Sequence, residues 1–123
     1  DWGHAKDYVE AMWKILQQKK PEDYVIATGK QYSIRTFINI VCKKLNIKIK
    51  WIGKGIKEKG FDSKKKQTII EIDKNYFRPL DVNTLLGNPA KAKKKLKWKP
   101  KYNLNSLIDE MISEEINIIN ENK

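Results

Sequence analysis

The chain has 123 residues, 40% of them apolar, so we expect one domain spanning 1–123. Its net charge of +11 is typical of a polyanion-binding protein, yet among 26 basic residues only Arg35 and Arg78 are arginines, the side chain favoured in nucleic-acid recognition. A single cysteine, Cys42, excludes an internal disulfide framework and fits a reducing cytoplasm. The sequence shows no signal peptide, no membrane-spanning run and no initiator Met, and we interpret it as a soluble fragment.

The first half of the chain alternates between helical and strand patterns. Apolar residues recur at i, i+3, i+4 and i+7 over 4–18 and predict an amphipathic helix. The β-prone run 24–28 predicts a buried strand. A helix over 33–45 would bury Cys42, and the period-two alternation over 47–51 predicts a half-exposed strand.

The second half is less regular. Residues 54–66 have no useful periodicity, so we expect a mobile loop, followed by a strand over 68–73. Asn88 and Pro89 form a strong start signal for a short helix.

The last element of the chain is predicted to be an amphipathic helix capped by Asn105 or Ser106. Strands separated by helices indicate an α/β fold. No glycine-rich phosphate loop follows a strand, so the pattern fits the small half of a two-domain enzyme rather than a complete dinucleotide-binding unit.

One candidate binding segment is YFRPLDV, which begins at residue 76. The guanidinium of Arg78, on a backbone stiffened by Pro79, suits a diphosphate, and the carboxylate of Asp81 suits a ribose hydroxyl. The alternative for Arg78 is a surface ion pair with Asp81 or Glu71. The alternative for Asp81 is a turn-forming role after proline. These residues point to a nucleotide-sugar site.

Several nearby side chains have structural interpretations. We expect either Tyr76 or Phe77 to be buried and so to fix the direction of Arg78. His4 could titrate near neutrality, but as a helix-entry histidine we expect it to pack or hydrogen-bond locally rather than act as a base. Asp7 is expected to stabilise the positive end of the first helix. The first residues are expected to fray.

Five segments together resemble one known family, GDP-mannose 4,6-dehydratase, in order and over nearly the whole chain. They are DWGHAKDYVEAMW, DYVIATG, GKGIKEKG, YFRP and LLGNPAKAKKKLKWKP. The resemblance implies an extended short-chain dehydrogenase/reductase, in which an N-terminal Rossmann domain holds NADP and a smaller C-terminal α/β domain closes over the nucleotide sugar. This chain would be the C-terminal substrate-binding domain, with the Rossmann domain absent.

The activity implied by the resemblance is the conversion of GDP-mannose to GDP-4-keto-6-deoxymannose in GDP-fucose and deoxyhexose synthesis. The catalytic Thr, Glu and Tyr-xxx-Lys pair of the family would precede Asp1, so we expect no catalytic residue here and no activity from the fragment alone. A cytoplasmic enzyme that forms dimers or tetramers is also implied.

The resemblance also suggests four substrate-binding residues and no metal ligand. Arg78 matches the arginine that contacts the diphosphate. Asp81 stands where the family usually carries Glu, so its shorter side chain would reach the ribose hydroxyl through a bridging water or a shifted backbone. Trp2 and Gly3 lie in the segment that enters the substrate pocket, where glycine allows close approach.

Two other functions compete with this interpretation. The first is a basic RNA- or polyanion-binding module, based on the charge and on the lysine runs 64–66 and 93–95. The second is a related nucleotide-sugar epimerase or dehydratase with a different base preference.

Overall fold

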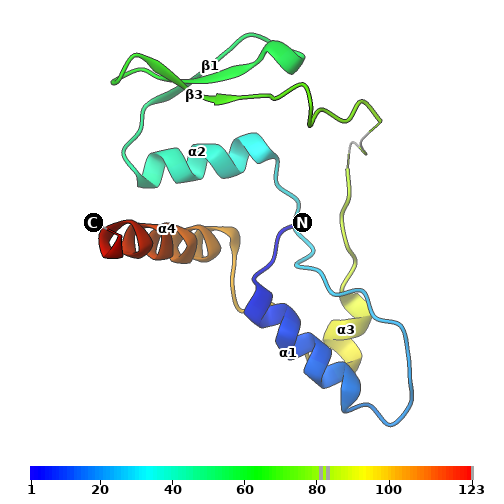
Figure 1. Ribbon diagram of the computed structural model, residues 1–123. Helices are drawn as coiled ribbons and strands as arrows, with labels where there is room; N and C mark the ends of the chain where they lie inside the picture. The colour runs from blue at the N-terminus through cyan, green and yellow to red at the C-terminus, as the bar shows by residue number, and fades with distance from the viewer. Residues whose placement is uncertain (81, 83, 123) are drawn as a thin grey trace. The chain divides into compact units, whose positions relative to one another are not determined.

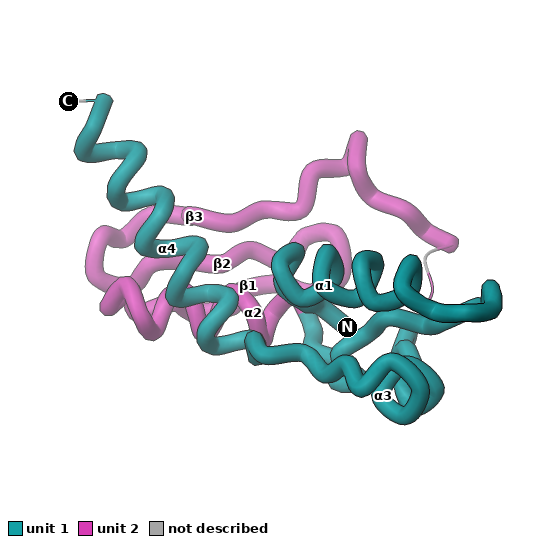
Figure 2. Tube along the Cα trace, turned by 90° about the horizontal axis from the view of Figure 1, so that it is seen from below, with its two compact units in different colours: residues 1–33, 84–123 teal, residues 34–83 magenta. Residues whose placement is uncertain are grey.

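The computed structural model describes residues 1–123 except 81, 83 and 123. The chain divides into two compact units, shown in Figure 2. Unit 1 comprises 1–33 with 84–123, and unit 2 comprises 34–83. That 1–123 acts as a single domain stays a prediction.

Unit 1 is helical within its described residues (Figure 1). Its helices are α1 (Ala5–Leu16), α3 (Ala90–Lys95) and α4 (Leu104–Glu121). Because Ala11 of α1 and Ala92 of α3 are fully buried and carry only a methyl group, their helices can pack closely around Trp98. The core is completed by Leu96, Tyr8, Ile15, Tyr24 and Ile26.

The helix starts in unit 1 are fixed by side chains. The predicted start of α3 is shifted by one residue, because the helix begins at Ala90 with Pro89 as its N-cap; Asn88 Oδ1 accepts a hydrogen bond from the Ala90 amide at 3.0 Å. The prediction for α4 is wrong by two or three residues, because the cap is Asn103. Its side chain accepts from the amides of Asn105 and Ser106, and the Ser106 hydroxyl accepts from the Asn103 amide. Ser106 is thus the reciprocal partner of a capping box rather than its first residue.

The predicted strand over 24–28 is wrong, since the structure has irregular backbone there. A strand needs a neighbouring strand to pair with, and the described part of unit 1 contains none. Ala27 is instead buried against Gly87, where an added Cβ would come within 2.3 Å of the Ala27 Cβ.

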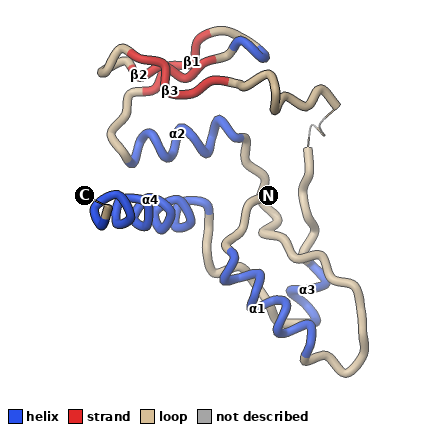
Figure 3. Tube along the Cα trace, in the orientation of Figure 1, coloured by secondary structure: helices blue, strands red, loops and turns tan. Residues whose placement is uncertain are grey.

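Unit 2 packs one helix beside a three-stranded antiparallel sheet of order β1-β2-β3 (Figure 3). Its elements are α2 (Ile34–Lys44), β1 (Ile49–Ile52), the 3-10 helix η1 (Gly55–Lys57), β2 (Lys59–Asp62) and β3 (Gln67–Glu71). The predicted helix and both predicted strands are therefore confirmed. Cys42 is buried in α2 as expected, and burial raises the pKa of its thiol.

The prediction of a mobile loop over 54–66 is wrong, because β2 forms the centre of the sheet. Its buried positions are Gly60 and Asp62, so the sequence lacks the apolar alternation that indicates a strand. An added Cβ at Gly60 would lie 2.9 Å from Ile49 Cδ1, which leaves no room for a side chain. Asp62 accepts a hydrogen bond from the Lys64 amide in the turn to β3.

No helix in the part of the chain that the structure describes is long and apolar enough to cross a membrane. The structure shows a small α/β protein, as the sequence predicts.

Candidate functional site

Arg78 lies in unit 2, after a turn that closes β3. The turn is held by the Asp73 side chain, which accepts a hydrogen bond from the Asn75 amide at 2.8 Å. Arg78 is exposed. The expected buried anchor beside it is wrong, since Tyr76 is 83% and Phe77 is 49% exposed. Segment 76–80 thus presents its side chains to solvent.

The alternative ion-pair partners of Arg78 can be partly resolved. The Glu71 carboxylate lies 2.6 Å from the Lys59 ammonium, in a pair across β2 and β3. Glu71 is therefore engaged by another cation. Asp81, the second predicted partner and a predicted substrate-binding residue, lies outside the described residues.

Trp2 and Gly3, the other predicted site residues, lie in unit 1 ahead of α1. Trp2 is 38% exposed and lines a cavity of about 250 Å³. The rest of this cavity is lined by Thr28, Lys30, Tyr32 and residues 100–104. A Cβ added at Gly3 would lie 2.4 Å from the Tyr8 hydroxyl, so the Tyr8 ring would have to move to admit any other residue there.

The first residue is well anchored. Asp1 Oδ1 accepts hydrogen bonds from the Thr28 amide at 2.8 Å and the Thr28 hydroxyl at 2.6 Å, and Oδ2 accepts from the Gly29 amide at 2.8 Å. Gly29 has φ +76°, a conformation that favours glycine. The expected fraying at Asp1 is therefore wrong. Because these residues are 27 or 28 positions apart, no local sequence pattern indicates this contact.

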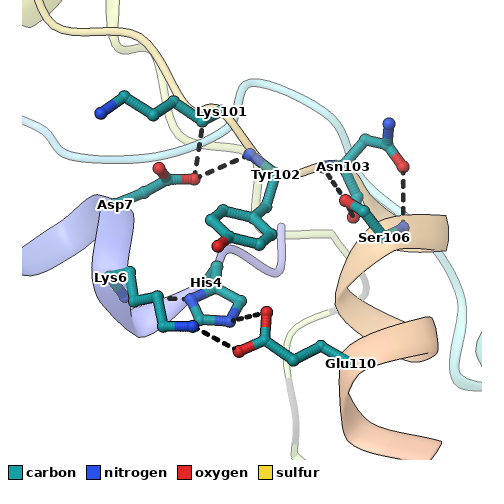
Figure 4. A network of polar contacts seen from close by, with 8 residues as sticks. All are labelled: His4, Lys6, Asp7, Lys101, Tyr102, Asn103, Ser106 and Glu110. Carbon is teal, nitrogen blue, oxygen red and sulfur yellow. Dashed lines mark hydrogen bonds and ion pairs between the residues drawn. The ribbon is translucent and has the colours of Figure 1, made fainter. Parts of the chain in front are cut away.

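His4 caps α1 and connects it to α4 (Figure 4). Its Nδ1 accepts from the Lys6 amide at 3.0 Å, and its Nε2 lies 3.2 Å from Glu110 Oε2. The imidazole stacks on Tyr102 with ring centroids 4.0 Å apart. Both ring nitrogens are engaged within the unit, which confirms the local structural role predicted for His4.

The same cluster contains an ion pair between Lys6 and Glu110, whose Nζ and Oε1 atoms lie 2.6 Å apart (Figure 4). The hydrogen bond from Lys6 lowers the pKa of Glu110, and the hydrogen bond to Glu110 raises the pKa of Lys6. Both groups are thus charged at neutral pH.

Asp7 is buried and accepts three hydrogen bonds from distant residues, which the sequence does not predict. Its Oδ2 accepts hydrogen bonds from the amides of Lys101 and Tyr102, both at 3.0 Å (Figure 4). The Trp98 indole donates to the Asp7 carbonyl oxygen at 2.9 Å. Asp7 was expected to act on the helix end, but it also holds the segment that leads into α4.

One lysine side chain in each of the two runs that suggest a polyanion-binding module has a partner inside the protein. Lys64 Nζ donates to the Asn46 carbonyl and side-chain oxygens at 3.2 Å. Lys95 Nζ lies 2.6 Å from the Glu22 carboxylate.

The described residues of the predicted nucleotide-sugar site belong to different units. Trp2 and Gly3 lie in unit 1, and Arg78 lies in unit 2.

Comparison with known proteins identifies the family. The family model described as GDP-mannose 4,6 dehydratase matches residues 1–111. The chain is 50% identical over 119 residues to a Dictyostelium discoideum GDP-mannose 4,6 dehydratase, covering 97% of this chain and 33% of the relative. It is 48% identical over 116 residues to GDP-mannose 4,6 dehydratase 2 of Caenorhabditis elegans, covering 94% and 30%.

A bacterial relative, the GDP-mannose 4,6-dehydratase of Vibrio cholerae, is 44% identical over 128 residues, covering 96% of this chain and 34% of the relative. The chain thus spans about a third of the length of the curated relatives that it matches. From the match over residues 1–111, we conclude that the chain belongs to the GDP-mannose 4,6-dehydratase family.

Proposed function

We propose that this chain is the substrate-binding part of an enzyme that converts GDP-mannose to GDP-4-keto-6-deoxymannose, on the route to GDP-fucose and other deoxyhexoses. The observation that carries the proposal is the family match over residues 1–111, at about a third of the relatives' length. In this proposal the chain is the small C-terminal domain of an extended short-chain dehydrogenase/reductase, and the N-terminal Rossmann domain lies outside it.

The remaining part of the enzyme would supply NADP and the catalytic groups. Among the described residues no glycine-rich loop between a strand and a helix offers a dinucleotide phosphate site. When bound, NADP would supply reversible hydride chemistry, so that oxidation at C4 and reduction at C6 of the sugar would cancel and the net reaction would be the loss of the C6 hydroxyl as water. We therefore expect the chain alone to be inactive. By the same family resemblance, the intact enzyme would be a cytoplasmic homodimer or homotetramer.

The role of this chain's residues is to bind and orient the nucleotide sugar. The Arg78 guanidinium would pair with the diphosphate, because it stays charged and can donate to two oxygens at once. Its exposure, and the pairing of Glu71 with Lys59, support this role. Trp2 and Gly3 would contact the nucleotide sugar. Asp81 would accept a hydrogen bond from the ribose.

Binding is tested by amide NMR of the chain titrated with GDP-mannose. Localised shifts are expected in segments 2–4 and 76–80, and Arg78→Ala should remove them. Lys74→Ala, which removes an exposed cation four residues away, is the matched control and should bind normally. Shifts that spread over the lysine runs and vanish with added salt would instead support the polyanion-binding alternative.

Activity is tested in a chimera in which this chain replaces the matching third of the Dictyostelium relative. We expect the chimera to release GDP-4-keto-6-deoxymannose, and Arg78→Ala to weaken GDP-mannose binding about ten- to hundredfold, the effect of losing a charged hydrogen bond. A chimera that prefers UDP-sugars would support the epimerase alternative. An Arg78→Ala chimera with unchanged KM and kcat would rule out the diphosphate contact.

A further inference from the structure

Trp2 lies between two residues, Asp1 and His4, whose side chains are held by hydrogen bonds. On one side, the Asp1 carboxylate is bound by Thr28 and Gly29. On the other side, His4 is bound by the Lys6 amide and by Glu110. The backbone on either side of the Trp2 indole is thus fixed, although the indole itself is 38% exposed.

The contact between Asp1 and the 28–29 turn, here called the clasp, uses both carboxylate oxygens. Three donors converge on them, at 2.6 to 2.8 Å, and hydrogen bonds to an ionised carboxylate are about twice as strong as neutral ones. The Thr28 hydroxyl accepts a hydrogen bond from the Lys30 amide at 3.1 Å and has two acceptors of its own, the Lys30 carbonyl oxygen at 3.3 Å and Asp1 Oδ1 at 2.6 Å, of which Asp1 is the nearer.

The clasp is continuous with the surface that Trp2 presents. Thr28 and Trp2 both line the cavity of about 250 Å³ in unit 1. This volume is below the range of about 300–1,000 Å³ typical of whole ligand pockets, so the cavity suits one ring or one charged group of a larger ligand. A shift of the clasp would move the indole at the wall of this cavity.

We propose that Thr28 and Gly29 are positioning residues, which act through Asp1 to hold Trp2 in place for the nucleotide sugar. This inference rests on the proposed function, because Trp2 is taken to contact that ligand. It explains the orientation of Trp2 by the hydrogen bonds between Asp1 and the 28–29 turn. Neither Thr28 nor Gly29 need touch the ligand.

The test compares Thr28→Val, Thr28→Ser and Asp1→Ala with the matched control Thr84→Val, which alters an exposed threonine of the same unit. In the chain without ligand, the indole N–H signal of Trp2, assigned with Trp2→Phe, should shift or broaden in Thr28→Val and Asp1→Ala. Thr28→Ser, which keeps the hydroxyl, should restore it. Circular dichroism confirms that each variant remains folded.

In the chimera, Thr28→Val and Asp1→Ala should raise the KM for GDP-mannose about tenfold and leave kcat within about twofold, because binding rather than chemistry is affected. The inference is overturned if both variants match Thr84→Val in KM, or if the Trp2 signal does not respond to them. The proposed function fails separately, when the parent chimera does not turn over GDP-mannose.

Discussion

At the scale of single residues, Asp7 connects distant segments of unit 1 through its buried carboxylate. Its side chain is 1% exposed and accepts two backbone hydrogen bonds from residues more than 90 positions away. A buried carboxylate is tolerated only when such donors compensate for the loss of water. Asp7 therefore couples the first turn of α1 to the segment that leads into α4.

We predict that Asp7→Ala lowers the free energy of unfolding by about 2–4 kcal/mol, because the amides of Lys101 and Tyr102 lose their acceptor inside the protein. Asp7→Asn should cost less, since its amide oxygen can still accept. Urea unfolding followed by circular dichroism measures the difference. Asp23→Ala, at an exposed aspartate, is the control, and equal midpoints for it and Asp7→Ala would contradict the prediction.

Residue-scale prediction from sequence succeeded where the chemistry was local. The structural role of His4 and the burial of Cys42 could be predicted because they depend on helix position and apolar neighbours. The clasp between Asp1 and Thr28 could not, since it joins segments that no periodicity relates. The expectation that either Tyr76 or Phe77 is buried fails for a related reason, because aromatic character alone does not imply burial and both side chains are exposed.

At the scale of elements, local patterns predicted most of the helices and strands. Helix α1, helix α2 and strand β1 have clear periodicity and formed where expected. Strand β2 could not be found, because glycine and a buried aspartate occupy its inward positions. Conversely, the run 24–28 has strong β propensity but no strand to pair with in the described part of its unit.

The start of α4 gives a prediction at this scale. Asn103→Ala should lower the free energy of unfolding by about 1 kcal/mol, because the amides of Asn105 and Ser106 lose their acceptor at the helix end. Asn105→Ala, two residues later and also exposed, should cost little. Thermal melts of the two variants decide between Asn103 and the cap that the sequence first suggested, which would require the opposite order.

At the scale of the whole molecule, α1 has two apolar faces. Tyr8, Ala11 and Ile15 belong to the core of unit 1. The other face forms a continuous stripe, spaced i, i+3, i+4 and i+7, in which every side chain is more than 60% exposed. The stripe consists of Val9, Met12, Trp13 and Leu16.

An exposed apolar stripe on a chain that spans about a third of its relatives' length favours association. We predict that the chain self-associates as its concentration rises, and that Met12→Lys with Leu16→Lys shifts it toward monomer in sedimentation velocity, with helix content unchanged. Gln31→Lys with Gln67→Lys adds the same charge at exposed polar positions and should leave association as it was. If the control variant dissociates equally, charge repulsion rather than the stripe governs association. A parent chain that sediments as a monomer at every concentration would contradict the prediction that α1 carries a contact surface.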